Sequence, residues 1–111
     1  MTETPWKTEK RVMMCKLTDR VIIRSRDSGV HWGILKSRTG AEVELADARR
    51  IWSWSGAATL SELATAGVTR PADCKFSVRV PAITIIGVCE VIPCTERACE
   101  IIDEVPEWTM Q

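Results

Sequence analysis

The sequence predicts an α+β domain: a mostly antiparallel sheet of about five strands, two short helices and an N-terminal arm. Short β-branched segments alternate with turn residues as far as Trp54, whereas helical spacing follows Ala58 and again Pro93. A length of 111 residues, with 45% hydrophobic and 27% charged side chains, is typical of one globular domain. We therefore expect an arm over residues 1–18 and a single domain over residues 19–111.

The first part of the domain is predicted to be a three-stranded meander. RVIIRSR (20–26) and VHWGILK (30–36) are rich in β-branched residues and flank the turn residues DSG. VELADARRIWSW (43–54) follows a second turn, which contains Gly40. Strands joined by such short turns pair antiparallel, so we expect these segments to lie side by side.

A helix is predicted next, over TLSELATAG (59–67). Thr59 occupies the N-cap position and Glu62 follows three residues later, which is the capping-box pattern. Gly67 can adopt the left-handed conformation that ends many helices.

Two more strands are predicted after this helix. CKFSVRV (74–80) alternates in polarity, which places Phe76, Val78 and Val80 on the inner face. AITIIGVCEVI (82–92) is apolar on both faces, a pattern typical of a central strand.

The last predicted element is a helix over ERACEIIDEV (96–105), with Thr95 as its N-cap and Pro106 beyond its end. Its inner stripe consists of Ala98, Ile102 and Val105. The predicted order is therefore β-β-β-α-β-β-α.

Charge is balanced over the whole chain but unevenly distributed along it. Fifteen Lys and Arg match fifteen Asp and Glu, so nucleic acid is not expected as a partner. Residues 1–81 carry 14 basic and 9 acidic side chains, whereas residues 82–111 carry one basic and six acidic ones. This asymmetry favours pairing within the chain or between copies. The charge asymmetry, the five tryptophans and the apolar residues of the arm together predict a homo-oligomer.

The cysteine pattern argues against a metal site or a disulfide framework. The five cysteines include no CxxC pair, and His31 is the sole histidine, so the usual zinc-ligand spacing is missing. We expect reduced cysteines that behave as small buried hydrophobic residues, and no metal or cofactor. No apolar run approaches the length of about 20 residues that spans a membrane.

The stretch ARRIWSWSGAATLSELA (48–64) contains the candidate binding residues. Side chains alternate along a strand, so Arg50, Trp52 and Trp54 are predicted to share one face. Tryptophan rings stack on planar groups, arginine binds phosphate or carboxylate, and the start of a helix favours an anion. The predicted ligand-binding set is Arg49, Arg50, Trp52, Trp54, Ser55, Gly56 and Thr59.

Other interpretations of these residues remain open. The tryptophan pair also suits a core or an oligomer interface, and Thr59 with Glu62 also suits plain helix capping. Arg24, Arg26 and His31 form either the rim of a site or a solvated hairpin. No nucleophile-elbow, P-loop, HExxH or paired-carboxylate motif is present, so an enzyme is not expected.

The combination of this stretch with CKF (74–76) and VIPCTERA (91–98) resembles a family of short tailed-phage proteins, over about residues 20–108. In that family the position of Ser53 is often tyrosine and the N-terminal arm is usually shorter. The resemblance implies expression in the cytoplasm of an infected bacterium. It supplies no activity, so the function has to be inferred from the residues.

Three classes of function fit these observations. The first is a non-enzymatic binding protein that sequesters a nucleotide-like anion, such as an immune signal of the host. The second is an oligomeric virion or assembly component, with Trp6, Trp32 and Trp108 as interface anchors. The third is an inhibitor that binds a host protein. The second class places the protein in the virion, and the others place it in the host cytoplasm.

Overall fold

The computed structural model describes residues 20–110, so the predicted arm over residues 1–18 lies outside the described part. It has the predicted α+β fold, with a six-stranded antiparallel sheet and two α-helices. The strands are β1 (Arg20–Ser25), β2 (Gly29–Thr39), β3 (Glu42–Ser53), β4 (Lys75–Phe76), β5 (Val80–Ile85) and β6 (Val88–Pro93). The helices are α2 (Leu60–Ala66) and α3 (Glu96–Asp103), with a 3-10 turn at Pro71–Asp73.

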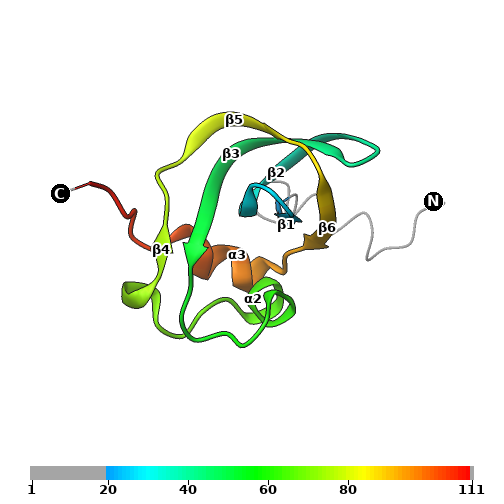
Figure 1. Ribbon diagram of the computed structural model, residues 1–111. Coiled ribbons are helices and arrows are strands. Elements are labelled where there is room, and N and C mark those ends of the chain that lie inside the picture. Colours follow the sequence, from blue (N-terminus) through cyan, green and yellow to red (C-terminus); the bar gives the residue numbers. More distant parts are fainter. Residues whose placement is uncertain (1–19, 111) are drawn as a thin grey trace, which may run out of the picture.

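The sheet has the order β4-β3-β2-β1-β6, and β5 pairs with β3 next to β4. β1, β2 and β3 form the predicted antiparallel meander. In Figure 1, β5 and β6 arch together over the meander, and α2 and α3 lie on the opposite side. The arch joins the two edges of the sheet, because β5 pairs with β3 and β6 pairs with β1.

The prediction of one central strand over residues 82–92 is wrong. The chain turns at Gly87, which has a φ of 76°, and this turn separates two edge strands. The two strands turn apolar side chains toward different parts of the interior, Ile83 and Ile85 toward one cluster and Ile92 toward another. β5 contributes only to the smaller cluster, whereas β6 contributes to both, since its Val88 and Val91 pack against the smaller cluster and its Ile92 against the larger one. The segment is therefore apolar on both faces without being central.

The segment CKFSVRV (74–80) is a strand only at its start. Phe76 is fully buried as predicted, but Val78 is 43% exposed. Ser77 forms two bonds to β3: its N–H donates to the carbonyl of Arg50, and its hydroxyl accepts the N–H of Arg50, both at 2.8 Å. These bonds end the β4 pairing, and Val78 therefore leaves the inner face before β5 begins.

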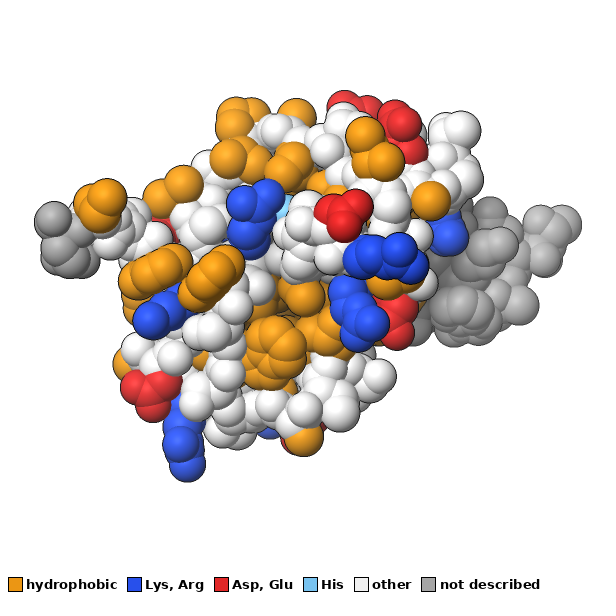
Figure 2. Space-filling view, viewed as in Figure 1, with side chains coloured by type: hydrophobic (Ala, Val, Ile, Leu, Met, Phe, Trp, Pro, Cys, Tyr) orange, Lys and Arg blue, Asp and Glu red, His pale blue; other side chains and the backbone are white. Residues whose placement is uncertain are grey.

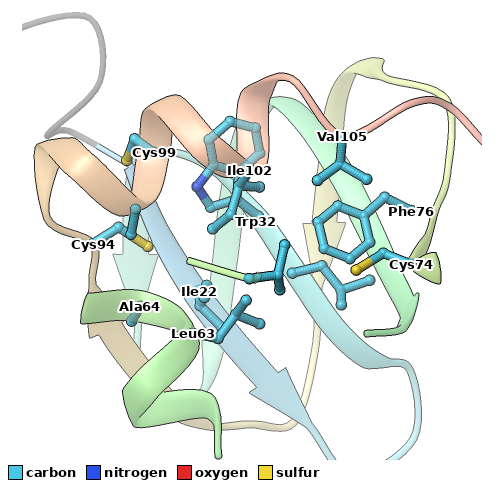
Figure 3. Packing of buried hydrophobic residues seen from close by; sticks show 13 residues of the cluster. Ile22, Trp32, Leu63, Ala64, Cys74, Phe76, Cys94, Cys99, Ile102 and Val105 are labelled. Carbon is cyan, nitrogen blue, oxygen red and sulfur yellow. The ribbon is translucent and has the colours of Figure 1, made fainter. Parts of the chain in front are cut away.

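Two hydrophobic clusters lie on opposite faces of the meander. The larger cluster fills the space between the sheet and the helices, where Figure 3 shows Trp32 among Ile22, Cys99 and Ile102. The smaller cluster lies under the arch and consists of Val21, Ile23, Val43, Leu45, Ala48 and Ile85. Alternation along β1 produces this division, because Ile22 and its two neighbours point to opposite faces.

Both helices begin as the sequence predicts. The hydroxyl of Thr59 accepts the N–H of Glu62 at 3.1 Å, and the carboxylate of Glu62 accepts the N–H of Ala58 at 2.7 Å. The hydroxyl of Thr95 accepts the N–H of Ala98 at 3.0 Å. The predicted inner stripe of the last helix is buried: Ala98 and Ile102 belong to α3, and Val105 follows just beyond its end.

The cysteines only partly follow the prediction of buried, inert thiols. Cys74, Cys94 and Cys99 are buried, but Cys89 is exposed on β6, and Cys15 lies outside the described residues. A thiol hydrogen bond to Cys99, together with burial, raises the pKa of Cys94 well above its ordinary value. Cys94 therefore stays protonated at neutral pH, where the thiolate is the reactive form.

His31 is a buried polar residue on β2, and its Nε2 lies 3.0 Å from the carbonyl oxygen of Ser28. Burial, and secondly the positive charge of Arg50, lower the pKa of His31 below its ordinary value of 6.5. In the unfolded chain the imidazole is protonated as the pH falls below about 6.5, whereas in the folded protein it is protonated only at a lower pH.

We therefore expect the free energy of unfolding to decrease as the pH falls below about 6.5, until the folded His31 is also protonated. His31→Gln, which keeps a side-chain N–H for Ser28 but does not titrate, should remove this component. Urea denaturation of both proteins between neutral and mildly acidic pH measures the difference. Identical pH profiles of the two proteins would contradict the assignment.

Candidate functional site

An open groove lies between the turn that joins β1 to β2 and the end of β3. Its volume is about 610 Å³. The Arg-Trp groove, as we name it, is lined by Arg26, Asp27, Ser28, Gly29, Val30, Arg50, Ile51, Trp52 and Trp54. The face seen in Figure 2 shows hydrophobic side chains in a hollow that basic side chains border.

Strand pairing explains why these two segments meet. Val30 at the start of β2 pairs with Ile51 near the end of β3, and His31 pairs with Arg50. The turn residues before Val30 therefore lie beside the last residues of β3. The groove is thus formed by two segments, residues 26–30 and 50–54, that lie far apart in the sequence.

The charges in the groove are mainly positive. Within residues 20–110, neither Arg26 nor Arg50 has a carboxylate within ion-pair distance. Asp27 is the single acidic residue among those that line the groove. Unpaired guanidinium groups beside an aromatic wall are suited to an anion that carries a planar ring.

The two groove tryptophans differ in how firmly the fold holds them. Trp52 is 66% exposed, so its ring is available to a ligand. Trp54 is half-buried against the larger hydrophobic cluster, and its indole N–H donates to the carbonyl of Ala57 at 3.0 Å. Trp54 therefore forms a fixed wall, and Trp52 forms an accessible one.

Trp108 extends this aromatic surface beyond the groove. Its ring stacks on that of Trp52 with a centroid distance of 6.4 Å and an interplanar angle of 17°. The ammonium of Lys75 lies 5.2 Å from the centre of the Trp108 ring. The backbone of Trp108 is bound to β4, because its N–H donates to the carbonyl of Phe76 at 2.9 Å.

Arg49, which the sequence suggested as a binding residue, does not line the Arg-Trp groove. It is 1% exposed, and its guanidinium points into the protein. There it donates to the carbonyls of Ile102 at 2.9 Å, Ser77 at 3.2 Å and Pro106 at 3.4 Å. Arg49 therefore joins β3 to α3, and the predicted set is corrected by its removal.

Ser55, Gly56 and Thr59 lie outside the Arg-Trp groove. The N–H of Ser55 donates to the thiol of Cys74 at 3.4 Å. Gly56 has a φ of 96°, and a Cβ there would collide with Thr69, so packing rather than close approach of a ligand requires glycine. These contacts indicate structural roles for Ser55 and Gly56.

The start of α2, which the sequence suggested as an anion site, is capped by side chains of the helix itself. Side chains of Thr59 and Glu62 already bind the N–H groups of Glu62 and Ala58. Thr59 instead borders a second open hollow of about 500 Å³, which shares Val30 and Trp54 with the Arg-Trp groove.

Sequence reasoning missed the part that the first turn contributes. The sequence suggests Arg26 either as a rim residue or as part of a solvated hairpin, and it suggests Asp27 only as a turn residue. Hairpin chemistry identifies the turn but does not show what lies beside it. The strand register supplies that information.

No group of three or more potential metal ligands occurs within the part of the chain that the structure describes. No helix among residues 20–110 is long and apolar enough to cross a membrane.

Comparison with known proteins yields one match. Residues 18–102 match the family described as domain of unknown function DUF6948. No curated protein and no solved structure matches the chain. The matched region includes Arg26, Arg50, Trp52 and Trp54, and ends before Trp108. Because the match covers most of the sequence, the chain belongs to the DUF6948 family.

Proposed function

We propose that the protein is a non-enzymatic binding protein for a nucleotide-like anion, which it holds in the Arg-Trp groove. The observation that supports this most directly is that two guanidinium groups without an ion pair among residues 20–110 lie in one hollow with two tryptophans. Arg26 and Arg50 would bind the anionic group. Trp52 and Trp54 would contact the planar ring.

The residues of the groove fit binding better than catalysis. General acid-base chemistry needs a group that exchanges a proton near neutral pH, within reach of the reacting atom. The groove offers one carboxylate, Asp27, and two arginines, which stay charged. Its shape is open rather than closed around a reacting centre, so retention of a ligand is the activity that we propose.

The resemblance to tailed-phage proteins suggests where such binding acts. We propose that the protein works in the cytoplasm of an infected bacterium, where it lowers the free concentration of a nucleotide signal made by the host. Sequestration requires only affinity and abundance, and a groove without catalytic groups is sufficient for it.

Trp52→Ala is expected to weaken nucleotide binding by roughly ten- to a hundredfold, because one base-stacking contact contributes about 1–3 kcal/mol. The fold should tolerate this change, since the side chain is 66% exposed. Calorimetric titration with cyclic dinucleotides and with ADP-ribose measures the affinity, and a thermal melt of each protein measures stability.

Trp54→Ala is the matched control for this test. Trp54 is half-buried against the core, so its removal should lower the melting temperature. The proposal fails if no member of the panel binds to the wild-type protein. It also fails if Trp52→Ala unfolds the protein, because Trp52 would then be a core residue.

A second candidate function is an interface between copies or with a partner protein. The observation that favours it is the exposed aromatic surface: Trp52 is 66% exposed, Trp108 48% and Met110 96%. Exposed tryptophans are enriched at interface hot spots. Trp32, also suggested as an anchor, is fully buried and has no role there, and Trp6 lies outside the described residues.

Sedimentation equilibrium at micromolar concentration tests the proposed homo-oligomer. We expect a mass at least twice the 12.4 kDa of one chain, and a shift toward one chain in Trp108→Ala. A wild-type mass of a single chain would contradict self-association.

A further inference from the structure

A smaller cavity lies behind Arg50, where β3 changes its pairing from β4 to β5. Its volume is about 210 Å³, and we name it the His31 cavity. Its apolar walls include Val78, Val80 and Ile83. Its polar residues are His31, Arg49, Arg50 and Ser77.

His31 brings an unusual hydrogen-bonding group to the cavity wall. It is 1% exposed, and its Nε2 lies 3.0 Å from the carbonyl oxygen of Ser28. A carbonyl oxygen can only accept, so Nε2 carries the proton and Nδ1 has a free lone pair. Among residues 20–110, Nδ1 has no hydrogen-bond partner.

The environment keeps this imidazole neutral. Burial and the neighbouring charge of Arg50 lower the pKa of His31 from its ordinary value. A neutral ring with Nε2 protonated presents Nδ1 as an acceptor at physiological pH. A ligand group that donates a hydrogen bond would give this acceptor a partner in place of solvent.

Arg50 connects the His31 cavity to the Arg-Trp groove, because it lines both. It pairs directly with His31 across β2 and β3, so the two side chains emerge from the same face of the sheet. One anionic group bound by Arg50 would therefore have the groove on one side and the cavity on the other.

The geometry points to the His31 cavity as a second subsite, which takes a small ring that carries an N–H beside a carbonyl. The ring N–H would donate to Nδ1 of His31, and the carbonyl would accept from Arg50. Uracil is the simplest nucleic-acid base with this arrangement. The ligand is then a dinucleotide, with its phosphodiester on Arg50, one base in the groove and the other in the cavity.

This inference rests on the proposed function for the position of the phosphodiester, and the experiment separates the two. His31 is the single histidine of the sequence, so its ring nitrogens give one set of signals in a ¹⁵N NMR spectrum. The probe is the dinucleotide uridylyl-uridine, added to the full-length protein without a histidine tag. We expect the Nδ1 resonance to move to lower frequency as Nδ1 accepts the hydrogen bond.

Two comparisons test the chemistry of the cavity. The analogue methylated at N3 of both uracils lacks the donor, and we expect it to bind about three- to tenfold more weakly and to leave Nδ1 unshifted. Val78→Trp should close the cavity mouth, and it should be tolerated because Val78 is 43% exposed. This variant should bind uridylyl-uridine no better than uridine monophosphate, with no shift of Nδ1.

The outcomes distinguish the subsite from the groove. Suppose that uridylyl-uridine binds and that Trp52→Ala weakens its binding, but that the Nδ1 resonance does not shift. This result would support binding in the groove and overturn the second subsite. If the Nδ1 resonance shifts and Trp52→Ala leaves the affinity for uridylyl-uridine unchanged, the cavity binds the ligand and the proposed role of the groove is wrong. An absence of binding at millimolar uridylyl-uridine overturns the second subsite.

Discussion

Arg49→Met is expected to lower the free energy of unfolding by about 2–4 kcal/mol, the largest effect that we predict for any arginine of β3. Methionine can replace the aliphatic part of the buried side chain but not its donors. The carbonyls of Ser77, Ile102 and Pro106 would lose a charged hydrogen-bond partner. Burial, and secondly Arg79, lower the pKa of Arg49, whereas the carboxylates of Glu107, Asp103 and Asp47 raise it.

Arg50→Met is the matched control, one residue further along the same strand. Arg50 is exposed and has no ion pair within residues 20–110, so the change should alter stability by less than about 0.5 kcal/mol. Urea denaturation followed by circular dichroism measures both variants. The opposite order of stability would show that Arg50, not Arg49, is the structural arginine.

Asp47→Ala is expected to cost about 2–4 kcal/mol, because it leaves the buried guanidinium of Arg20 without its carboxylate. Arg20 also donates to the carbonyl of Asp47 at 2.8 Å and lies 4.2 Å above the ring of Trp32. Asp47 has a φ of 49°, a conformation that aspartate adopts more readily than alanine. In Asp47→Ala, the loss of the ion pair and the backbone strain therefore both lower the free energy of unfolding.

Two further variants separate these contributions. Asp47→Gly removes the carboxylate but adopts a positive φ freely, so it should recover the part of the loss that is due to strain. Glu90→Ala removes an exposed ion pair with Arg24, of 3.8 Å, and should cost less than about 1 kcal/mol. Equal melting temperatures for Asp47→Ala and Glu90→Ala would contradict a structural role for the Arg20–Asp47 pair.

Local signals in the sequence predicted the elements that depend on local interactions. The capping residues Thr59 and Thr95 begin their helices as expected, and the turn residues separate the strands of the meander. The division of residues 82–92 into two edge strands was not predictable in the same way. That division depends on pairing with β3 and β1, which lie far away in the sequence.

The candidate site was predictable to a similar extent. Alternation along β3 correctly placed Arg49 and Arg50 on opposite faces, but it left open whether Trp52 is buried or exposed. The sequence does not show that three carbonyls converge on Arg49, so it could not assign the two arginines to different roles. Arg26 joins the groove through strand register, which composition does not reveal.

The indole N–H signals of the five tryptophans provide the most direct test of nucleotide binding in the Arg-Trp groove. A ¹⁵N NMR titration with ADP-ribose and with a cyclic dinucleotide should shift the signals of Trp52 and Trp54, which line the groove. The signal of Trp32, which is fully buried, should stay in place. Unchanged Trp52 and Trp54 signals at millimolar concentrations of both ligands would contradict the proposal.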